Sequence, residues 1–297
     1  MNFNKSKWLG LILLFLGCFS LGWAEDSLSL NRVTVALKPD KNPDKMLSEK
    51  KRLETYLSEK LGKPVTVVIP LSSAVIQAGF LNGTIDMGYL SSTDMAMAKD
   101  NGGADLLLAG KIDGKAYYSS YWLTLKDKPY TKVEDLRGKP VAFASKTSTS
   151  GFLMPLRDMH KKELFTLEQG PEAFFGRGNV YYGIGYVSAV ERVLNGDAEA
   201  AAVSDYVYEQ GRHLTPEQRA RLKVMASQGP VPTHVIAVRS NLSDSDKAIL
   251  RQVLLDLNKE NPELRDQMFT SELIEVDTDE HLQPTREALE LVKRLRF

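Results

Sequence analysis

The sequence lacks the cysteines that a disulfide framework or a thiolate metal site would need. Its single cysteine in 297 residues is Cys18, whereas one disulfide takes two cysteines and zinc or iron–sulfur sites take more. It also lacks an excess of charge of one sign, because 38 Lys and Arg balance 38 Asp and Glu. This balance argues against attraction to nucleic acid, so we expect no nucleic-acid partner and look for specificity in a local site.

Histidine is scarce, and its spacing excludes the common metal and catalytic motifs. The four histidines lie far apart, with no His-x-x-x-His pair, and there is no Gly-x-Ser-x-Gly elbow. Residues 183–188 only partly match a dinucleotide fingerprint and are better interpreted as a turn between a strand and a helix. We therefore expect no metal, no cofactor and no catalytic residues, and the protein is predicted not to be an enzyme.

Long hydrophobic runs are lacking except at the N-terminus. Residues 8–23 form an apolar run after Lys5 and Lys7, and it ends at Ala24 ahead of two acidic residues. The run is shorter than the ~20 apolar residues that span a bilayer, and the pattern is typical of a secretory signal peptide over residues 1–24. Alternatively, FLGC at 15–18 is a lipobox with a lipid anchor at Cys18. Both interpretations predict a periplasmic or other extracytoplasmic protein.

The chain as a whole has an ordinary globular composition, 43% hydrophobic and 26% charged, and is long enough for about two domains. β-branched runs at residues 33–37, 65–69 and 85–90 alternate with segments of helical periodicity. This pattern predicts a wound α/β sheet, in which the carboxyl ends of the strands line a crevice.

A second α/β set predicts a second lobe inserted into the first. The β-prone run 117–125 carries the chain out of the first set, and residues 228–232 form a second crossing before a further strand and helix. We therefore predict a discontinuous lobe one, residues 25–118 and 233–297, and a lobe two over residues 119–232.

The polar segment STSG at residues 148–151 is the strongest candidate site. It lies between a predicted strand and a predicted helix. Three hydroxyls beside a helix N-terminus offer side-chain donors, free backbone N–H groups and the positive end of the helix dipole, which all suit an oxyanion. One hydroxyl would be enough for ordinary N-capping, which is the alternative interpretation.

The segment around STSG resembles the phosphonate-, phosphite- and phosphate-binding periplasmic proteins of ABC transporters. The similar stretches are residues 86–90, 135–143, 148–155, 193–196 and 231–243. The resemblance implies a type II periplasmic binding protein: α/β, with two Rossmann-like lobes joined by two hinge strands. It also implies a monomeric solute-binding protein of an ABC importer. Its partners would be a small phosphorus oxyanion, bound on the Ser-Thr-Ser turn, and an ABC permease.

The sequence departs from the family pattern around this turn. Tyr186 stands where the family has an anion-facing histidine, Ser73 lies where phosphonate binders have a tyrosine, and His234 replaces an aspartate. A tyrosine offers a neutral hydroxyl and more bulk than a histidine. We therefore still expect an oxyanion headgroup, but a narrower choice of ligand that does not favour an aminoalkylphosphonate.

The predicted ligand-binding residues come from both lobes. Asp205 is expected to repel an anion or to accept a hydrogen bond from a protonated anion or an ammonium substituent, and its role is left open. The alternative function is a periplasmic sensor that docks on a membrane signalling receptor. The full predicted set is Ser148, Thr149, Ser150, Tyr186 and Asp205 in lobe two, Tyr89, Ser91, Ser73 and His234 in lobe one, and Tyr118 near the hinge.

Overall fold

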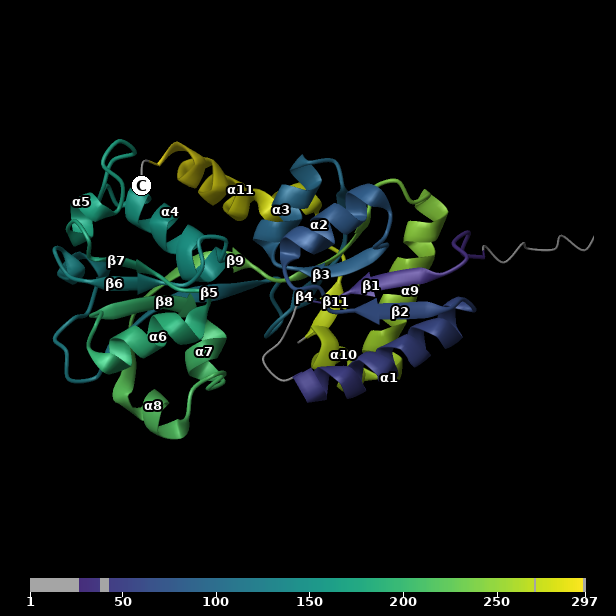
Figure 1. Ribbon diagram of the computed structural model, residues 1–297, viewed down its shortest axis with the longest axis horizontal. Coiled ribbons are helices and arrows are strands. Elements are labelled where there is room, and N and C mark those ends of the chain that lie inside the picture. The colour runs from purple at the N-terminus through teal and green to yellow at the C-terminus, as the bar shows by residue number, and fades with distance from the viewer. Residues whose placement is uncertain (1–26, 38–42, 270, 296–297) are drawn as a thin grey trace, which may run out of the picture.

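The computed structural model describes residues 27–37, 43–269 and 271–295. Figure 1 shows two lobes side by side, each built around its own sheet. The predicted signal peptide and the alternative anchor at Cys18 lie outside the described residues. Within the described ranges, no helix combines the length and the apolar character needed to cross a bilayer.

Lobe one contains a six-stranded mixed sheet in the order β11-β4-β10-β3-β1-β2. β1 pairs in parallel with β2 and β3, whereas β10 runs antiparallel to β3 and β4. The sheet therefore combines strands from both ends of the chain. Its strands are β1 (Val33–Ala36), β2 (Val65–Val68), β3 (Met87–Leu90), β4 (Ala104–Lys111), β10 (Val235–Arg239) and β11 (Glu272–Ile274).

Helices cover both faces of this sheet. Alternate residues of β1 point to opposite sides, so Val35 lies in the larger apolar cluster and Ala36 in the smaller one. The carboxyl ends of β2 and β3 lead directly into α2 and α3, which puts the starts of these two helices at the cleft between the lobes. The helices are α1 (Pro43–Leu61), α2 (Ser73–Asn82), α3 (Ser92–Asp100), α9 (Asp244–Glu260) and α10 (Pro262–Phe269).

Lobe two contains a five-stranded sheet in the order β7-β6-β8-β5-β9. Its strands are β5 (Tyr117–Leu125), β6 (Val141–Phe143), β7 (Val180–Tyr182), β8 (Ala200–Ser204) and β9 (Leu222–Pro232). Its helices are the 3-10 helix η1 (Val133–Leu136), the π-helix η2 (Thr149–Leu153), α4 (Met154–Lys161), α5 (Glu172–Phe175), α6 (Tyr186–Asn195), α7 (Asp205–Glu209) and α8 (Pro216–Arg221).

Two adjacent strands connect the lobes. The chain leaves lobe one after β4 and enters β5, and it returns from β9 to β10, with β5 and β9 paired antiparallel. The Thr233 hydroxyl donates to the carbonyl oxygens of Gly110 (2.7 Å) and Ala116 (3.0 Å), which ties the two crossings together. The predicted architecture of two lobes and two hinge strands is confirmed.

The last helix, α11 (Thr278–Arg294), spans both lobes along one side (Figure 1). Leu282 packs in a lobe-one cluster, whereas Ala288 and Leu291 belong to the aromatic core of lobe two. We therefore propose the predicted lobe boundaries with one correction: the second half of α11 belongs to lobe two rather than lobe one. Helical periodicity identifies an apolar face, but it does not say which core that face contacts.

His281 on α11 is buried against both hinge crossings. Its ring lies 5.4 Å from that of Tyr117, and its Nε2 lies 3.4 Å from the carbonyl oxygen of Thr233. Burial lowers the pKa of His281 from its ordinary value of 6.5. Below pH 6.5 this histidine takes up a proton in the unfolded chain but stays neutral in the folded chain. The free energy of unfolding therefore decreases as the pH falls below 6.5.

We expect His281→Phe to reduce the loss of stability in acid. The phenyl ring keeps the packing against Tyr117 and has no proton to gain. Thermal unfolding midpoints should therefore fall less between neutral and mildly acidic pH in the variant than in the wild type. Equal slopes in the two proteins would rule out this role for His281.

Candidate functional site

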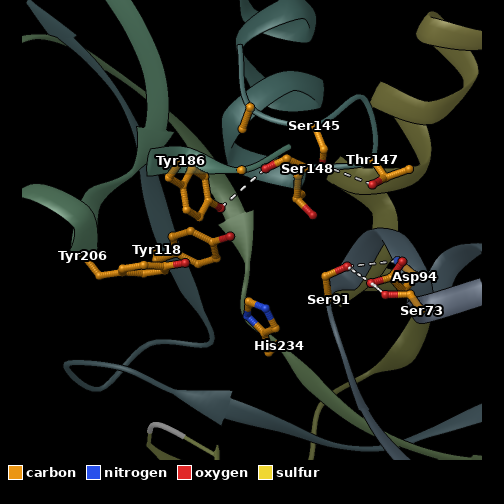
Figure 2. Close-up of a pocket in the computed structure, with 13 residues that line it drawn as sticks. Ser73, Ser91, Asp94, Tyr118, Ser145, Thr147, Ser148, Tyr186, Tyr206 and His234 are labelled. Carbon is orange, nitrogen blue, oxygen red and sulfur yellow. Dashed lines mark hydrogen bonds between the residues drawn. The ribbon is translucent and has the colours of Figure 1, made fainter. Parts of the chain in front are cut away.

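A cavity of about 180 Å³ lies between the lobes, at the starts of helices from both of them (Figure 2). Most of its lining side chains are hydroxyls. The lining residues are Ser73, Ser91, Asp94, Tyr118, Ala144, Ser145, Thr147, Ser148, Thr149, Gly185, Tyr186, Tyr206 and His234.

The polar turn predicted from STSG forms one wall of this cavity. The helix that begins at Thr149 opens with one π-helical turn and continues as α4. Ser148 is its N-cap, and its Oγ accepts a hydrogen bond from the Gly151 N–H at 3.1 Å. The N–H groups of the first helical turn have no carbonyl partners within the helix. Together with the helix dipole, they favour an anion beside Thr149 and Ser150.

Thr149 also contacts the opposite lobe. Its Oγ1 lies 2.7 Å from Oγ1 of Thr93 and 3.4 Å from Oγ of Ser92, both in the first turn of α3. The Thr285 hydroxyl on α11 donates to Ser92 at 3.0 Å. These buried hydroxyls join α3, η2 and α11, so the anion-binding turn lies directly at the contact between the lobes.

Ser150 lies behind the cavity wall, where it connects two tyrosines. Its Oγ accepts from the Tyr118 hydroxyl at 3.3 Å and lies 2.7 Å from the Tyr186 hydroxyl. Ser120 donates to the Ser150 carbonyl at 2.6 Å, and Gln228 donates to Ser120 at 2.7 Å. Because the Ser150 side chain is not among the lining groups, we expect it to orient the tyrosines.

Three tyrosines from lobe two form a second wall. Tyr186 begins α6, and its ring packs edge-on against Tyr206 at 5.7 Å. Burial raises the pKa values of Tyr118 and Tyr206 well above 10, and the neighbouring Tyr186 adds to both shifts. These two phenols therefore keep their protons at neutral pH and act as neutral hydrogen-bond donors.

A carboxylate from lobe one forms the third wall. The Asp94 Oδ2 accepts hydrogen bonds from Ser91 Oγ (2.6 Å) and Ser73 Oγ (2.9 Å) (Figure 2). Ser91 is also the N-cap of α3 and accepts from the Asp94 N–H at 3.1 Å. Asp94 is therefore fixed in place by the start of its own helix and by the start of α2.

Two predicted site residues of lobe one differ in their access to the cavity. His234 lines it, and the ring of Tyr89 stacks on His234 at 5.4 Å. Tyr89 is not among the lining residues, because its hydroxyl donates to the Phe269 carbonyl at 3.0 Å. Tyr89 therefore supports His234 from behind instead of facing a ligand.

Asp205 is not among the lining residues either. Its Oδ2 accepts from the Ser119 N–H at 2.8 Å, and its Oδ1 accepts from the Tyr206 N–H at 2.7 Å. Burial raises the pKa of the carboxyl group, and these backbone hydrogen bonds oppose the shift. Asp205 thus connects β5 to the helix that carries Tyr206, and we expect this role for it rather than a direct ligand contact.

The cavity is polar but carries little charge. Of the described residues that line it, none is Lys or Arg, and Asp94 and His234 are the ionisable groups besides the tyrosines. The described part of the chain contains no cluster of three or more His, Cys, Asp or Glu side chains that could hold a metal ion. A ligand here would be held by hydroxyls, backbone N–H groups and one carboxylate.

Comparison with known protein families shows which family this chain belongs to. The family of ABC transporter, phosphonate, periplasmic substrate-binding proteins matches residues 35–282, which include both lobes and the whole cavity. The chain belongs to this family. The resemblance predicted from the residues around the polar turn is confirmed.

The individual relatives in this comparison have low sequence identity to the chain. The phosphate-import protein PhnD of Mycolicibacterium smegmatis is 25% identical over 183 residues, 60% of this chain and 56% of that protein. The match thus spans little more than half the length of this curated relative.

Two solved structures share the fold of this chain. PhnD1 of Prochlorococcus marinus in complex with methylphosphonate has a TM-score of 0.73 at 16% identity, covering 89% of this chain and 99% of that chain. The periplasmic aliphatic sulphonate binding protein SsuA of Escherichia coli has a TM-score of 0.63 at 14% identity, covering 89% and 88%. At these identities the likeness concerns the fold alone.

Several residues that line the cavity were not identified from the sequence. Asp94 follows its N-cap Ser91 by three residues, which is a capping pattern that could have identified it. Tyr206 directly follows Asp205 at the end of a strand, but nothing local indicated that its ring would face Tyr186. Ser145 and Thr147, whose hydroxyls also line the cavity, lie just before the STSG segment.

Proposed function

We propose that this protein is the solute-binding component of an ABC importer and captures a small phosphorus oxyanion, such as a phosphonate, phosphite or phosphate, between its lobes. The observation that carries the proposal is the hydroxyl-lined cavity of about 180 Å³, which opens onto a helix start. An oxyanion finds N–H and O–H donors there. Membership of a phosphonate-binding family supports the same ligand class.

Capture depends on contacts from both lobes. Donors at Thr149 and Tyr186 come from lobe two, and Asp94 and His234 come from lobe one. A ligand that touches both sets binds the closed arrangement more tightly than an open one, so it shifts the equilibrium between the two toward closure. The closed form is then the species that we expect a permease to recognise.

We also propose where the protein is located and in which oligomeric state it acts. We propose export by a signal peptide at residues 1–24, and the alternative is a protein that stays anchored to the membrane by a lipid on Cys18. We further propose that the protein acts as a monomer and has no catalytic activity. The family description, which names a periplasmic substrate-binding protein, supports this assignment.

A thermal-shift screen followed by calorimetry tests the proposed ligand class. Phosphate, phosphite and methylphosphonate should each be compared with sulfate and small carboxylates at matched ionic strength. A ligand at one hundred times its dissociation constant adds about 2.7 kcal/mol of stability, which corresponds to several degrees in Tm. Stabilisation by a carboxylate alone, with none from any phosphorus oxyanion, would contradict the proposal.

A further inference from the structure

The lobe-one wall of the cavity offers hydrogen-bond acceptors. A serine hydroxyl has a single proton, and Ser73 and Ser91 both direct theirs to Oδ2 of Asp94, at 2.9 and 2.6 Å. Their oxygens therefore present lone pairs to a ligand, and an ionised carboxylate is itself only an acceptor. Asp94 is 6% exposed and lines the cavity.

The lobe-two wall offers donors. The Tyr118 hydroxyl donates to Ser150 Oγ at 3.3 Å, and Ser150 Oγ lies 2.7 Å from the Tyr186 oxygen, a contact in which either atom can donate. Tyr186 also accepts from Ser148 Oγ at 3.5 Å (Figure 2). When Ser150 donates in this pair, the proton of Tyr186 can be given to a ligand. The N–H groups at the helix start add further donors on the same side. The two walls therefore differ in hydrogen-bonding character.

A ligand in so small a cavity touches both walls. An oxyanion with only acceptor oxygens satisfies the donors of lobe two, but it places a negative oxygen against the Asp94 carboxylate without a proton between them. That contact is repulsive in a buried site. An oxyanion that also carries a donor, either a P–OH group or an ammonium group, can instead donate to Asp94.

We propose that Asp94 determines specificity by selecting oxyanions that carry a hydrogen-bond donor over oxyanions, such as sulfate and sulfonates, that have acceptor oxygens alone. This inference rests on the proposed function and deepens it. The fold does not make this choice, because it is shared by a protein solved with methylphosphonate and by an aliphatic sulphonate binding protein. His234 can donate or accept according to its tautomer, so it fits either class.

Methylphosphonate and methanesulfonate form a matched pair for the test. At weakly acidic pH both are tetrahedral monoanions of similar size, and only the phosphonate has an OH. Isothermal titration of the wild type should show tighter binding of methylphosphonate by about tenfold to a hundredfold, the range for a hydrogen bond to a charged group. Aminomethylphosphonate distinguishes the donors: tighter binding than methylphosphonate identifies ammonium, and weaker binding identifies P–OH.

Asp94→Asn should abolish this preference. The amide keeps an acceptor for the serines and adds N–H donors, so we expect methylphosphonate to weaken, methanesulfonate to strengthen and the two to bind within about threefold of each other. Asp246→Asn is the matched control. Asp246 occupies the same position after an N-cap serine, Ser243, at the start of α9, and it is not among the cavity residues. This variant should keep the wild-type preference.

The pH dependence in wild type gives a second test that needs no variant. Affinity for methylphosphonate should fall as the ligand loses its remaining proton, whereas affinity for methanesulfonate should stay level. Methanesulfonate does not titrate in this range, so it controls for any change in the protein itself.

Equal affinity for the two anions in the wild type, or equal weakening of both by Asp94→Asn, would overturn the specificity role and leave the proposed function intact. Failure of every phosphorus oxyanion to bind the wild type would overturn the proposed function, and this inference with it.

Discussion

Replacing Ser148, Thr149 and Ser150 together by alanine should weaken ligand binding by at least about a hundredfold, because each hydrogen bond to a charged group contributes about 1.5–3 kcal/mol. Ser148 and Thr149 line the cavity directly. Ser150 acts through Tyr186, whose hydroxyl lies 2.7 Å from Ser150 Oγ. Titration calorimetry with the best ligand of the screen measures the loss.

The fold should survive this triple change. The substitution removes the N-cap of the helix that begins at Thr149, which costs about 1 kcal/mol. Ser243→Ala removes the equivalent cap of α9, away from the cavity, and serves as the control. It should lower Tm by less than the triple change, which also removes the hydroxyl contacts of Thr149 and Ser150, and it should leave affinity unchanged. Wild-type affinity in the triple variant would mean that the anion binds elsewhere.

Gly151→Ala should have the second-largest effect on ligand binding, because the structure has no space for the methyl group of an alanine at this position. A Cβ at this position would lie 2.5 Å from Cβ of Ala144, 2.8 Å from Oγ of Ser148 and 3.0 Å from Cε1 of Tyr186. Relieving these contacts must move the N-cap, the tyrosine or both. We expect a loss of about 1–3 kcal/mol in stability, together with a marked loss of affinity.

Gly185→Ala provides the comparison for stability. A Cβ there would have no heavy atom within 4 Å, and its φ of 179° is extended backbone that any residue adopts. Its Tm should therefore stay close to that of the wild type. If Gly151→Ala leaves both stability and affinity unchanged, the turn can accommodate a methyl group, and the close packing around Gly151 is not needed for binding.

Much of the fold could be predicted because local signals mark the ends of its elements. A glycine follows α2, for example, and the helix ends there, with Gly83 in the left-handed conformation that glycine adopts easily. Thr215, followed by a proline and then Gln218 at the third helical position, likewise forms the cap of α8. The path of α11 could not be predicted, because its apolar face fits either core and long-range packing makes the choice.

The candidate site was predictable only in part, for a similar physical reason. The run of hydroxyls before a helix is a local signal, so Ser148 and Thr149 could be proposed from the sequence. The proximity of Asp94 to this turn arises when two lobes meet, and no spacing in the chain records it. The role of Asp205 could not be read from the sequence, because a polar residue after a strand can hydrogen-bond the backbone as well as a ligand.

A crystal structure of the protein with methylphosphonate tests the central claim most directly. The account predicts the phosphonyl group between the lobes, with oxygens on the N–H groups at the start of the helix and on Tyr186, and with the P–OH directed at Asp94. A phosphonate bound outside this cavity, or inside it without contact to the 148–150 turn, would contradict the account.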